Sequence, residues 1–217
     1  MKNLYKSLIE DTIKTIINQF HRKPHNFFNE HEFHQYCYHV FYGKKEFSRQ
    51  YATFDRKKTN ILHPEYPTLK RFSRKKLKVN QGVRARYDMA ILNPKFIENN
   101  SFKKVQCRDI KLFKDPKDFK SKNLIVALEF KFIIRHSAQY EHEIKYDHFK
   151  LSNAGEVELK YMLVFTNAVE GKKKEGENYF KSLKGDKGVK IIYVAVIGDG
   201  DKRKIMIKQY PDKWLDI

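Results

Sequence analysis

Several features that define other protein classes are scarce in this sequence. Its 217 residues include only two cysteines, Cys37 and Cys107, which form no Cys-x-x-Cys pair. This argues against a disulfide framework or a structural zinc site, and it predicts a reducing, cytoplasmic setting. No apolar run is long enough to span a bilayer, and the N-terminus lacks the layout of a signal peptide. We therefore expect no membrane partner.

Phosphate-binding glycine motifs and internal repeats are missing as well. The sequence contains neither G-x-x-x-x-G-K-[ST] nor G-x-G-x-x-G. The two commonest loop signatures for nucleotide phosphates are therefore not available to it.

Negative charge is in short supply relative to positive charge. The chain has 45 lysines and arginines against 26 acidic residues, a formal net charge of +19. Such an excess attracts polyanions, chiefly nucleic acid and less often an anionic membrane surface. A lysine-rich composition that serves only solubility is the alternative.

What the sequence does have is one long apolar stretch with two charges inside it. Residues 123–135 read as a strand buried on both faces. Side chains alternate along a strand, so Glu129 and Lys131 project to the same side. A buried charge costs several kcal/mol unless it is paired or bound to a metal. This pattern predicts a functional site, and a simple Glu129–Lys131 pair on a half-exposed strand is the alternative.

A second strand supplies another acid. Residues 86–92 alternate and turn apolar, with Asp88 on the apolar side, and Asn93-Pro94 ends the run. No helix is predicted between this strand and residues 123–135, which favours an antiparallel pair. Two facing carboxylates repel each other unless a divalent cation lies between them.

Hard oxygen ligands of this kind suit Mg²⁺ or Mn²⁺. Asp88, Glu129 and the carbonyl of Phe130 would hold the ion, which would activate a water and bind a phosphate oxygen. Lys131 would orient or help to deprotonate that water and stabilise the pentavalent phosphorus. Phosphodiester hydrolysis is the chemistry that these residues predict.

The remaining elements predict a mixed β-sheet flanked by helices, an α/β fold. Expected helices are 3–20, a segment from Asn29 to about Gly43, 137–151 and 175–183. Further expected strands are 160–166, 189–197 and an edge strand at 204–210. Residues 44–60 receive no assignment, and the polar segment 95–122 is expected to be a variable insertion.

The combination of Asp88 with Glu129-Phe130-Lys131, set in strands and flanked by helices, resembles the PD-(D/E)XK nuclease superfamily. The resemblance covers about residues 29–197 and implies a restriction-endonuclease-like αβββαβ core with a Mg²⁺- or Mn²⁺-dependent phosphodiesterase site. It implies that Asp88 and Glu129 are metal ligands and that Lys131 is the catalytic lysine. Two departures are Tyr87, where the motif has proline, and the 41 residues from Asp88 to Glu129, which require an insertion. The chain then divides into an N-terminal helical extension, 1–24, and a nuclease-like domain, 25–217.

Many members of that superfamily also carry a glutamate on the first core helix. Glu30 falls on the apolar face of the helical wheel, and Glu32 lies well off it. Glu32 follows Asn29 by three residues, which resembles a capping box. We expect Glu30 to complete the site, with an ordinary first-turn acid as the alternative for both.

Other polar residues near these elements allow two interpretations. Asp147 and Lys150 lie one turn apart on the helix that follows the motif, where they either pair only with each other or join the site. The histidines His31, His34 and His39 form no set with metal-ligand spacing. We expect them to be solvated or at the edge of the core.

Residues 65–86 form a basic segment, flexible or hairpin-like, with Tyr66 and Phe72 interleaved. Such a segment suits phosphate contacts, and a solvated charged loop is the alternative. The candidate contacts are Lys70, Arg71, Arg74, Lys75, Lys76, Arg84 and Arg86.

The sequence therefore predicts a metal-dependent nuclease, with DNA favoured over RNA as the substrate. Two alternatives are a non-catalytic nucleic-acid-binding module that keeps the nuclease fold and a polyanion-binding protein of another α/β fold. The helix at 3–20 either packs on the core or mediates a homodimer.

Overall fold

The computed structural model describes residues 2–107, 109–113, 116–119, 121–133, 138–167, 188–198, 204–210, 213, 215 and 216. Its helices are α1 (Lys2–Arg22), η1 (Pro24–Asn26), α2 (Glu30–Tyr42), α3 (Lys45–Ser48), α4 (Pro94–Glu98), α5 (Phe102–Val105), η2 (Ile110–Leu112), η3 (Pro116–Phe119) and α6 (Ala138–Ser152). Its strands are β1 (Gln50–Ala52), β2 (Lys58–Asn60), β3 (Leu62–Ser73), β4 (Lys78–Val79), β5 (Val83–Leu92), β6 (Leu124–Ile133), β7 (Val157–Asn167), β8 (Val189–Ile197) and β9 (Lys204–Tyr210). The predicted helix at 175–183 lies outside the described residues.

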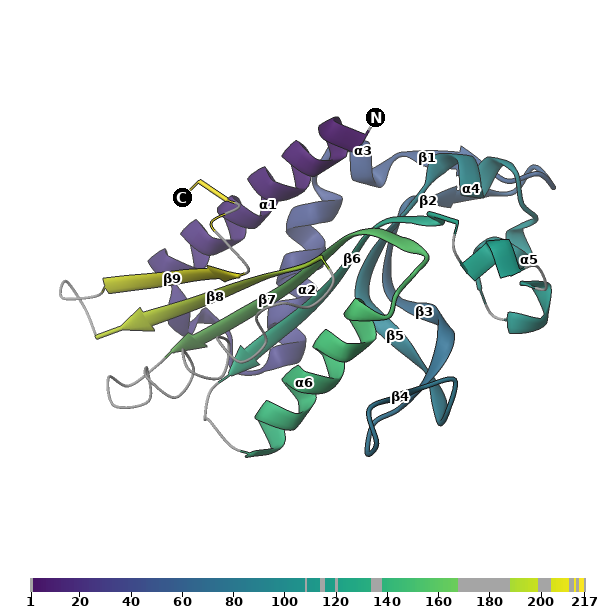
Figure 1. Cartoon of the computed structure of the whole chain (residues 1–217). Coiled ribbons are helices and arrows are strands. Elements are labelled where there is room, and N and C mark those ends of the chain that lie inside the picture. Colours follow the sequence, from purple (N-terminus) through teal and green to yellow (C-terminus); the bar gives the residue numbers. More distant parts are fainter. Residues whose placement is uncertain are drawn as a thin grey trace.

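A seven-stranded mixed sheet organises the molecule, with the order β4-β3-β5-β6-β7-β8-β9 (Figure 1). β6, β7 and β8 run parallel to one another, and the other neighbouring pairs are antiparallel. The predicted α/β class, the antiparallel pairing of β5 with β6 and the edge strand β9 are thus confirmed.

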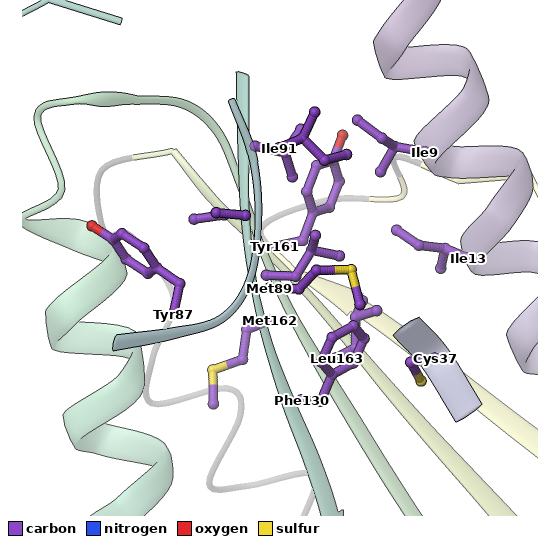
Figure 2. Close-up of a cluster of buried hydrophobic side chains, with 14 of the residues drawn as sticks. Ile9, Ile13, Cys37, Tyr87, Met89, Ile91, Phe130, Tyr161, Met162 and Leu163 are labelled. Carbon is purple, nitrogen blue, oxygen red and sulfur yellow. The ribbon is translucent and has the colours of Figure 1, made fainter. Parts of the chain in front are cut away.

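Helices cover both faces of this sheet: α1 and α2 lie on one face, and α6 lies on the other (Figure 1). The apolar residues that recur along α1 at helical spacing are completely buried: Ile9, Ile13, Ile16, Ile17 and Phe20. All five belong to the buried core, and Figure 2 shows Ile9 and Ile13 facing residues of β5, β6 and β7 there. The apolar face of α1 is therefore covered by its own chain, as one of the two predicted alternatives requires. Among the described residues, no helix has the length and apolarity needed to cross a membrane.

Aromatic rings fix α2 against the sheet. Phe33 lies with its ring centroid 4.6 Å from that of Phe165 and 5.6 Å from that of Phe132. The helix begins where predicted, because the side chain of Asn29 accepts a hydrogen bond from the backbone N–H of Glu32. This packing determines which α2 side chains reach β6.

All ten residues of β6 are buried, as its apolar composition predicts. Phe130 and Phe132 face α2, where they contact Phe33. Glu129 and Lys131, one residue out of step, face α6 instead. The charged side of the central strand is therefore enclosed by a helix.

The largest error of the sequence interpretation concerns residues 62–73. They form the 12-residue strand β3, which pairs with β5 along most of its length. Pro64, Pro67 and a cation-rich second half hide the strand pattern, and the register shifts between Pro67 and Arg71. Residues 65–86 are hairpin-like, as expected, but the hairpin is an integral part of the sheet. Its return requires glycine, because a Cβ on Gly82, at φ +76°, would lie 2.4 Å from the carbonyl oxygen of Phe72.

The segment 95–122 contributes to the core, although its polar composition suggested an appended insertion. α4, α5 and two 3-10 turns place Phe96, Ile97, Val105, Cys107 and Phe113 among the buried residues. Residues 44–60, which received no assignment, form α3 and the small β1–β2 sheet.

Candidate active site

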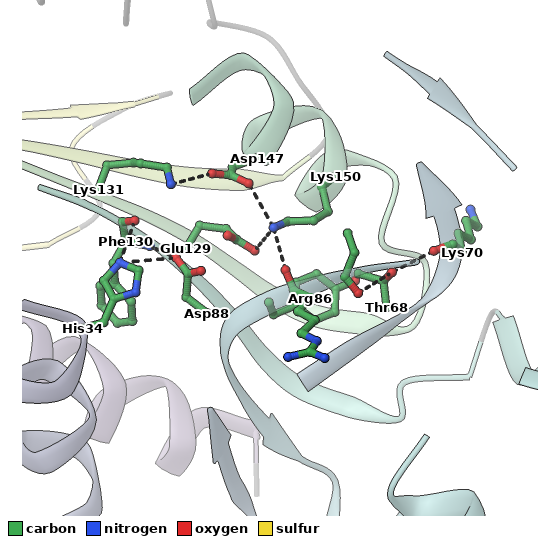
Figure 3. Close-up of polar contacts among 12 residues, drawn as sticks. His34, Thr68, Lys70, Arg86, Asp88, Glu129, Phe130, Lys131, Asp147 and Lys150 are labelled. Atoms are coloured by element: carbon green, nitrogen blue, oxygen red, sulfur yellow. Dashed lines mark hydrogen bonds and ion pairs between the residues drawn. The ribbon is translucent and has the colours of Figure 1, made fainter. Parts of the chain in front are cut away.

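The candidate site lies where β5 leaves β6. The pairing of these strands runs from Leu92 with Leu124 to Met89 with Leu128. Beyond Met89 the two backbones no longer pair. The side chain of Asp88 takes over there, because its Oδ2 accepts a hydrogen bond from the backbone N–H of Phe130 at 2.7 Å. Asp88 and the Glu129–Lys131 segment are therefore on the same part of the sheet, as the strand pattern predicts (Figure 3).

Glu129 is fully buried. Its Oε1 lies 2.8 Å from the Nζ of Lys150, and its Oε2 has no hydrogen-bond partner among the described residues. Burial raises the pKa of Glu129 well above its usual range, and the charge of Lys150 offsets only part of this effect. The protein alone does not fully compensate a charge at this position.

Lys131 extends from β6 towards two acids on different helices. Its Nζ lies 3.0 Å from Oε1 of Glu30 on α2 and 3.1 Å from Oδ2 of Asp147 on α6. Burial opposes the charge of Lys131, but Asp147 and Glu30 outweigh burial and raise its pKa above the ordinary value. In this arrangement Lys131 is an ammonium ion that can stabilise negative charge, rather than a base.

The ammonium group of Lys150 lies close to three oxygen atoms. Its Nζ lies 2.8 Å from Glu129, 3.0 Å from Oδ1 of Asp147 and 2.7 Å from the carbonyl oxygen of Arg86 (Figure 3). Asp147 thus bridges Lys150 and Lys131. Burial tends to raise the pKa of Asp147, but the two ammonium groups outweigh it and hold the pKa below its usual range.

The structure also brings His34 into the site. It lies one helical turn after Glu30 on α2, and its Nε2 is 3.1 Å from the carbonyl oxygen of Phe130. The same nitrogen lies 3.6 Å from Oε1 of Glu30 and 3.7 Å from Oδ2 of Asp88. The prediction that His34 lies at the edge of the core is confirmed, because its side chain is partly buried, but the sequence did not reveal that it contacts three predicted site residues.

The two candidate helix acids have separate roles. Glu30 contacts Lys131 and His34 in the site. Glu32 accepts a hydrogen bond from the backbone N–H of Phe28 at 2.9 Å, and its own N–H donates to Asn29. Glu32 therefore belongs to the N-terminal cap of α2, as the capping-box pattern indicates, and Glu30 points into the site.

The sequence did not assign three neighbours of the site: His34, Asp147 and Lys150. The sequence points to His34 only once Glu30 is taken as a site residue, because residues at i and i+4 lie on the same face of a helix. Asp147 and Lys150 do pair with each other at 3.0 Å, and both also reach β6. Their connection to the site depends on how α6 packs on the sheet, which helical spacing alone does not reveal.

The predicted phosphate-contact residues fall into two groups. Lys70 donates to the carbonyl of Asn153, and Arg84 donates to the carbonyl of Thr68 and to Sγ of Cys107, so both have structural partners. Arg74 pairs with Glu143 on α6 at 2.9 Å. Arg74 is nevertheless exposed, as are the other four, Arg71, Lys75, Lys76 and Arg86, of which Arg86 lies 3.9 Å from Glu65.

Comparisons of the chain with family models, with curated proteins and with solved structures give no match.

The donor set can be tested for its fit to a divalent cation. Among the described residues, no three His, Cys, Asp or Glu side chains already surround one point as metal ligands. Four carboxylates do gather around two ammonium groups, an excess of two negative charges when all are ionised. With the unpartnered Oε2 of buried Glu129, this chemistry suits a hard dication, provided that side chains rotate to meet it.

Proposed function

We propose that this protein is a divalent-metal-dependent nuclease of the PD-(D/E)XK type, with DNA as the favoured substrate over RNA. The observation that carries the proposal is the convergence of Asp88, Glu129 and Lys131 at the point where β5 leaves β6. The order α2, β3, β5, β6, α6, β7 also agrees with the αβββαβ core that the resemblance implies.

Asp88, Glu129 and the carbonyl of Phe130 would hold the Mg²⁺ or Mn²⁺ ion. When bound, such an ion lowers the pKa of a coordinated water and polarises a phosphate oxygen. Lys131, kept charged by Glu30 and Asp147, would hold the scissile phosphate and stabilise the charge that develops on it. The exposed cations of the β3–β5 hairpin would contact the backbone phosphates on either side.

One observation favours a second function. Lys150 already pairs with Glu129, and the described residues form no ready-made metal cluster. A non-catalytic nucleic-acid-binding module would keep this arrangement permanently, with the ammonium group of Lys150 in the place of a metal ion.

A cleavage panel separates the two functions. The purified chain would be incubated with linear and branched, single- and double-stranded DNA and with RNA, in Mg²⁺, in Mn²⁺ or in EDTA. The nuclease predicts metal-dependent products that disappear in EDTA and in Asp88→Ala, with nucleic-acid affinity retained. Binding of nucleic acid without cleavage of any substrate in either metal would favour the binding module instead.

A further inference from the structure

A pocket of about 420 Å³ lies between β3 and the segment that carries α5. Residues 63–67 of β3 form one wall, and Phe102 and Gln106, at the two ends of α5, belong to the other. A volume of this size is usual for sites that enclose small molecules or parts of larger ones. The α5 wall comes from the insertion between Asp88 and Glu129, so the pocket is an addition to the residues of the nuclease motif.

The pocket borders the candidate active site through β5. Arg86 lines the pocket two residues before Asp88, and its carbonyl oxygen accepts a hydrogen bond from Lys150 at 2.7 Å. The guanidinium group of Arg86 points away from Lys150 (Figure 3). On β3, Glu65 also lines the pocket, and it stands across from Asp88 in the antiparallel register. Two residues of a strand span about 7 Å, which is close to the advance of two stacked nucleotides at about 3.4 Å each.

Rings make up much of the pocket lining. Four of the lining residues carry one: Pro64, Tyr66, Pro67 and Phe102. The hydroxyl group of Tyr66 donates to the carbonyl oxygen of Val105 at 2.6 Å, which ties β3 to α5 and fixes the two walls relative to each other. An aromatic ring among apolar neighbours is the kind of surface on which nucleobases stack.

A few polar groups complement these rings. The side-chain amide of Gln106 can both donate and accept hydrogen bonds, and it has no partner among the described residues. His63 donates from Nε2 to the carbonyl oxygen of Asn60 at 2.7 Å, and burial lowers its pKa, so the neutral ring keeps Nδ1 as an acceptor. The pairing of Arg86 with Glu65, at 3.9 Å and exposed, contributes little, so the guanidinium group can turn towards a phosphate.

These groups match the parts of one nucleotide. A nucleobase has two flat faces and an edge of hydrogen-bond donors and acceptors, and a phosphate follows it along the strand. We propose that this pocket holds one unstacked base of the nucleic-acid substrate, about two nucleotides from the phosphate at Asp88. The proposal rests on the proposed function for the class of ligand. It predicts a preference for single-stranded or locally unpaired DNA, because a base in a duplex must leave its stack to enter.

The test compares binding of a strand with bases and of one without them. Fluorescence anisotropy in EDTA, where a metal-dependent nuclease leaves its substrate intact, would give the affinity for a short single-stranded DNA of mixed sequence. The same measurement would use an oligomer of equal length made of abasic deoxyribose phosphates. We expect Phe102→Leu and Gln106→Leu to bind the DNA at least about fivefold more weakly and the abasic oligomer within about twofold of the unchanged protein.

The controls make the same changes outside the pocket. Phe54→Leu replaces an exposed phenylalanine in the turn between β1 and β2, and Gln50→Leu replaces an exposed glutamine of β1. Neither residue lines the pocket, so both variants should bind the two oligomers like the unchanged protein. Urea unfolding of all four variants shows whether each one is folded.

Three results would overturn the inference. An equal loss for the abasic oligomer would show that the two residues act on the backbone or on the fold, and unchanged DNA affinity would show that no base enters the pocket. Deoxynucleoside monophosphates that bind as tightly as the strand, and with the same dependence on Phe102 and Gln106, would make the pocket a site for free nucleotides.

Each of these results leaves the proposed nuclease intact if the unchanged protein cleaves nucleic acid in the presence of metal. Conversely, base-dependent binding through Phe102 and Gln106 in a protein that cleaves nothing would leave the inference standing and refute the nuclease.

Discussion

At the scale of single residues, Asp147 connects the two buried lysines of the site. Its carboxylate lies 3.1 Å from Lys131 and 3.0 Å from Lys150. This position orients the Lys131 ammonium group. Asp147 is thus a positioning residue for the proposed chemistry, and the pH dependence of stability can test its ion pairs.

The pKa of Asp147 lies below its usual range, because the two ammonium groups outweigh burial. The carboxylate therefore stabilises the fold above the unfolded-state pKa of about 3.9, and this contribution is lost as the pH falls through the lower folded-state pKa. Urea unfolding of the unchanged chain and of Asp147→Asn should show a stability difference that is constant from about pH 5 to 8 and shrinks below about pH 4. A difference that grows as the pH falls would contradict the assigned ion pairs.

Glu30 and Glu32 form a matched pair on one helix turn. Glu30→Ala should slow cleavage by about 10- to 100-fold, because Lys131 and His34 lose a partner. Glu32→Ala should leave cleavage unchanged and lower the free energy of unfolding by about 0.5–1 kcal/mol, because it removes part of the α2 cap. Cleavage rates and urea unfolding of both variants check this. The opposite assignment of effects would show that Glu32 is the site acid.

The sequence predicts where the three motif residues lie, because strand alternation is a local property. Glu129 and Lys131 share a side in any regular strand, and Asp88 follows once β5 pairs with β6. His34 could not be found in this way. Its role depends on how α2 is held by Phe33 against β6 and β7, which is a property of tertiary packing.

At the scale of elements, the hairpin formed by β3, β4 and β5 carries several exposed cations. Arg71, Lys75 and Lys76 are exposed, whereas Lys70 and Arg84 hold the hairpin to its neighbours through Asn153 and Cys107. The strands thus present cations beside α6 on a fixed framework, as the pairing of Arg74 with Glu143 indicates.

Replacement of Arg71, Lys75 and Lys76 by alanine should weaken DNA binding and flatten its salt dependence. The slope of log affinity against log salt should fall by about 0.9 for each lost phosphate contact. Turnover at saturating DNA should change little. Binding titrations at several salt concentrations measure the effect.

The control is the removal of three exposed lysines of other elements: Lys58, Lys95 and Lys103. It changes the net charge equally, so an equal loss of salt dependence in both triple variants would show that the overall charge, and not the hairpin, binds the DNA.

The sequence of β3 explains why this strand was not predicted. Its first half contains Pro64 and Pro67, which are unfavourable within strands, and Glu65 has a positive φ of 51°. The strand persists because Leu62, Tyr66 and Leu69 bury their side chains in the core. Tertiary burial overrides local propensity here, and a single sequence contains no local signal of it.

At the scale of the whole molecule, the acidic cluster stands out against a net charge of +19. The positive field attracts a polyanion from a distance, and the carboxylates at the fork of β5 and β6 repel it locally unless a cation is present. Glu30, Asp88, Glu129 and Asp147 come from four separate elements, so only the complete sheet with α2 and α6 in place brings them together.

The most direct test of the account is the rate of metal-dependent DNA cleavage at saturating substrate by Lys131→Met and by its control, Lys190→Met. Both changes remove a charged lysine on the sheet that is paired with a helix glutamate, Glu30 in one case and Glu10 in the other. The account predicts a fall of about 100-fold or more for Lys131→Met, because the charge beside the scissile phosphate is lost, and no more than a few-fold change for Lys190→Met. Equal cleavage rates in the two folded variants would contradict it.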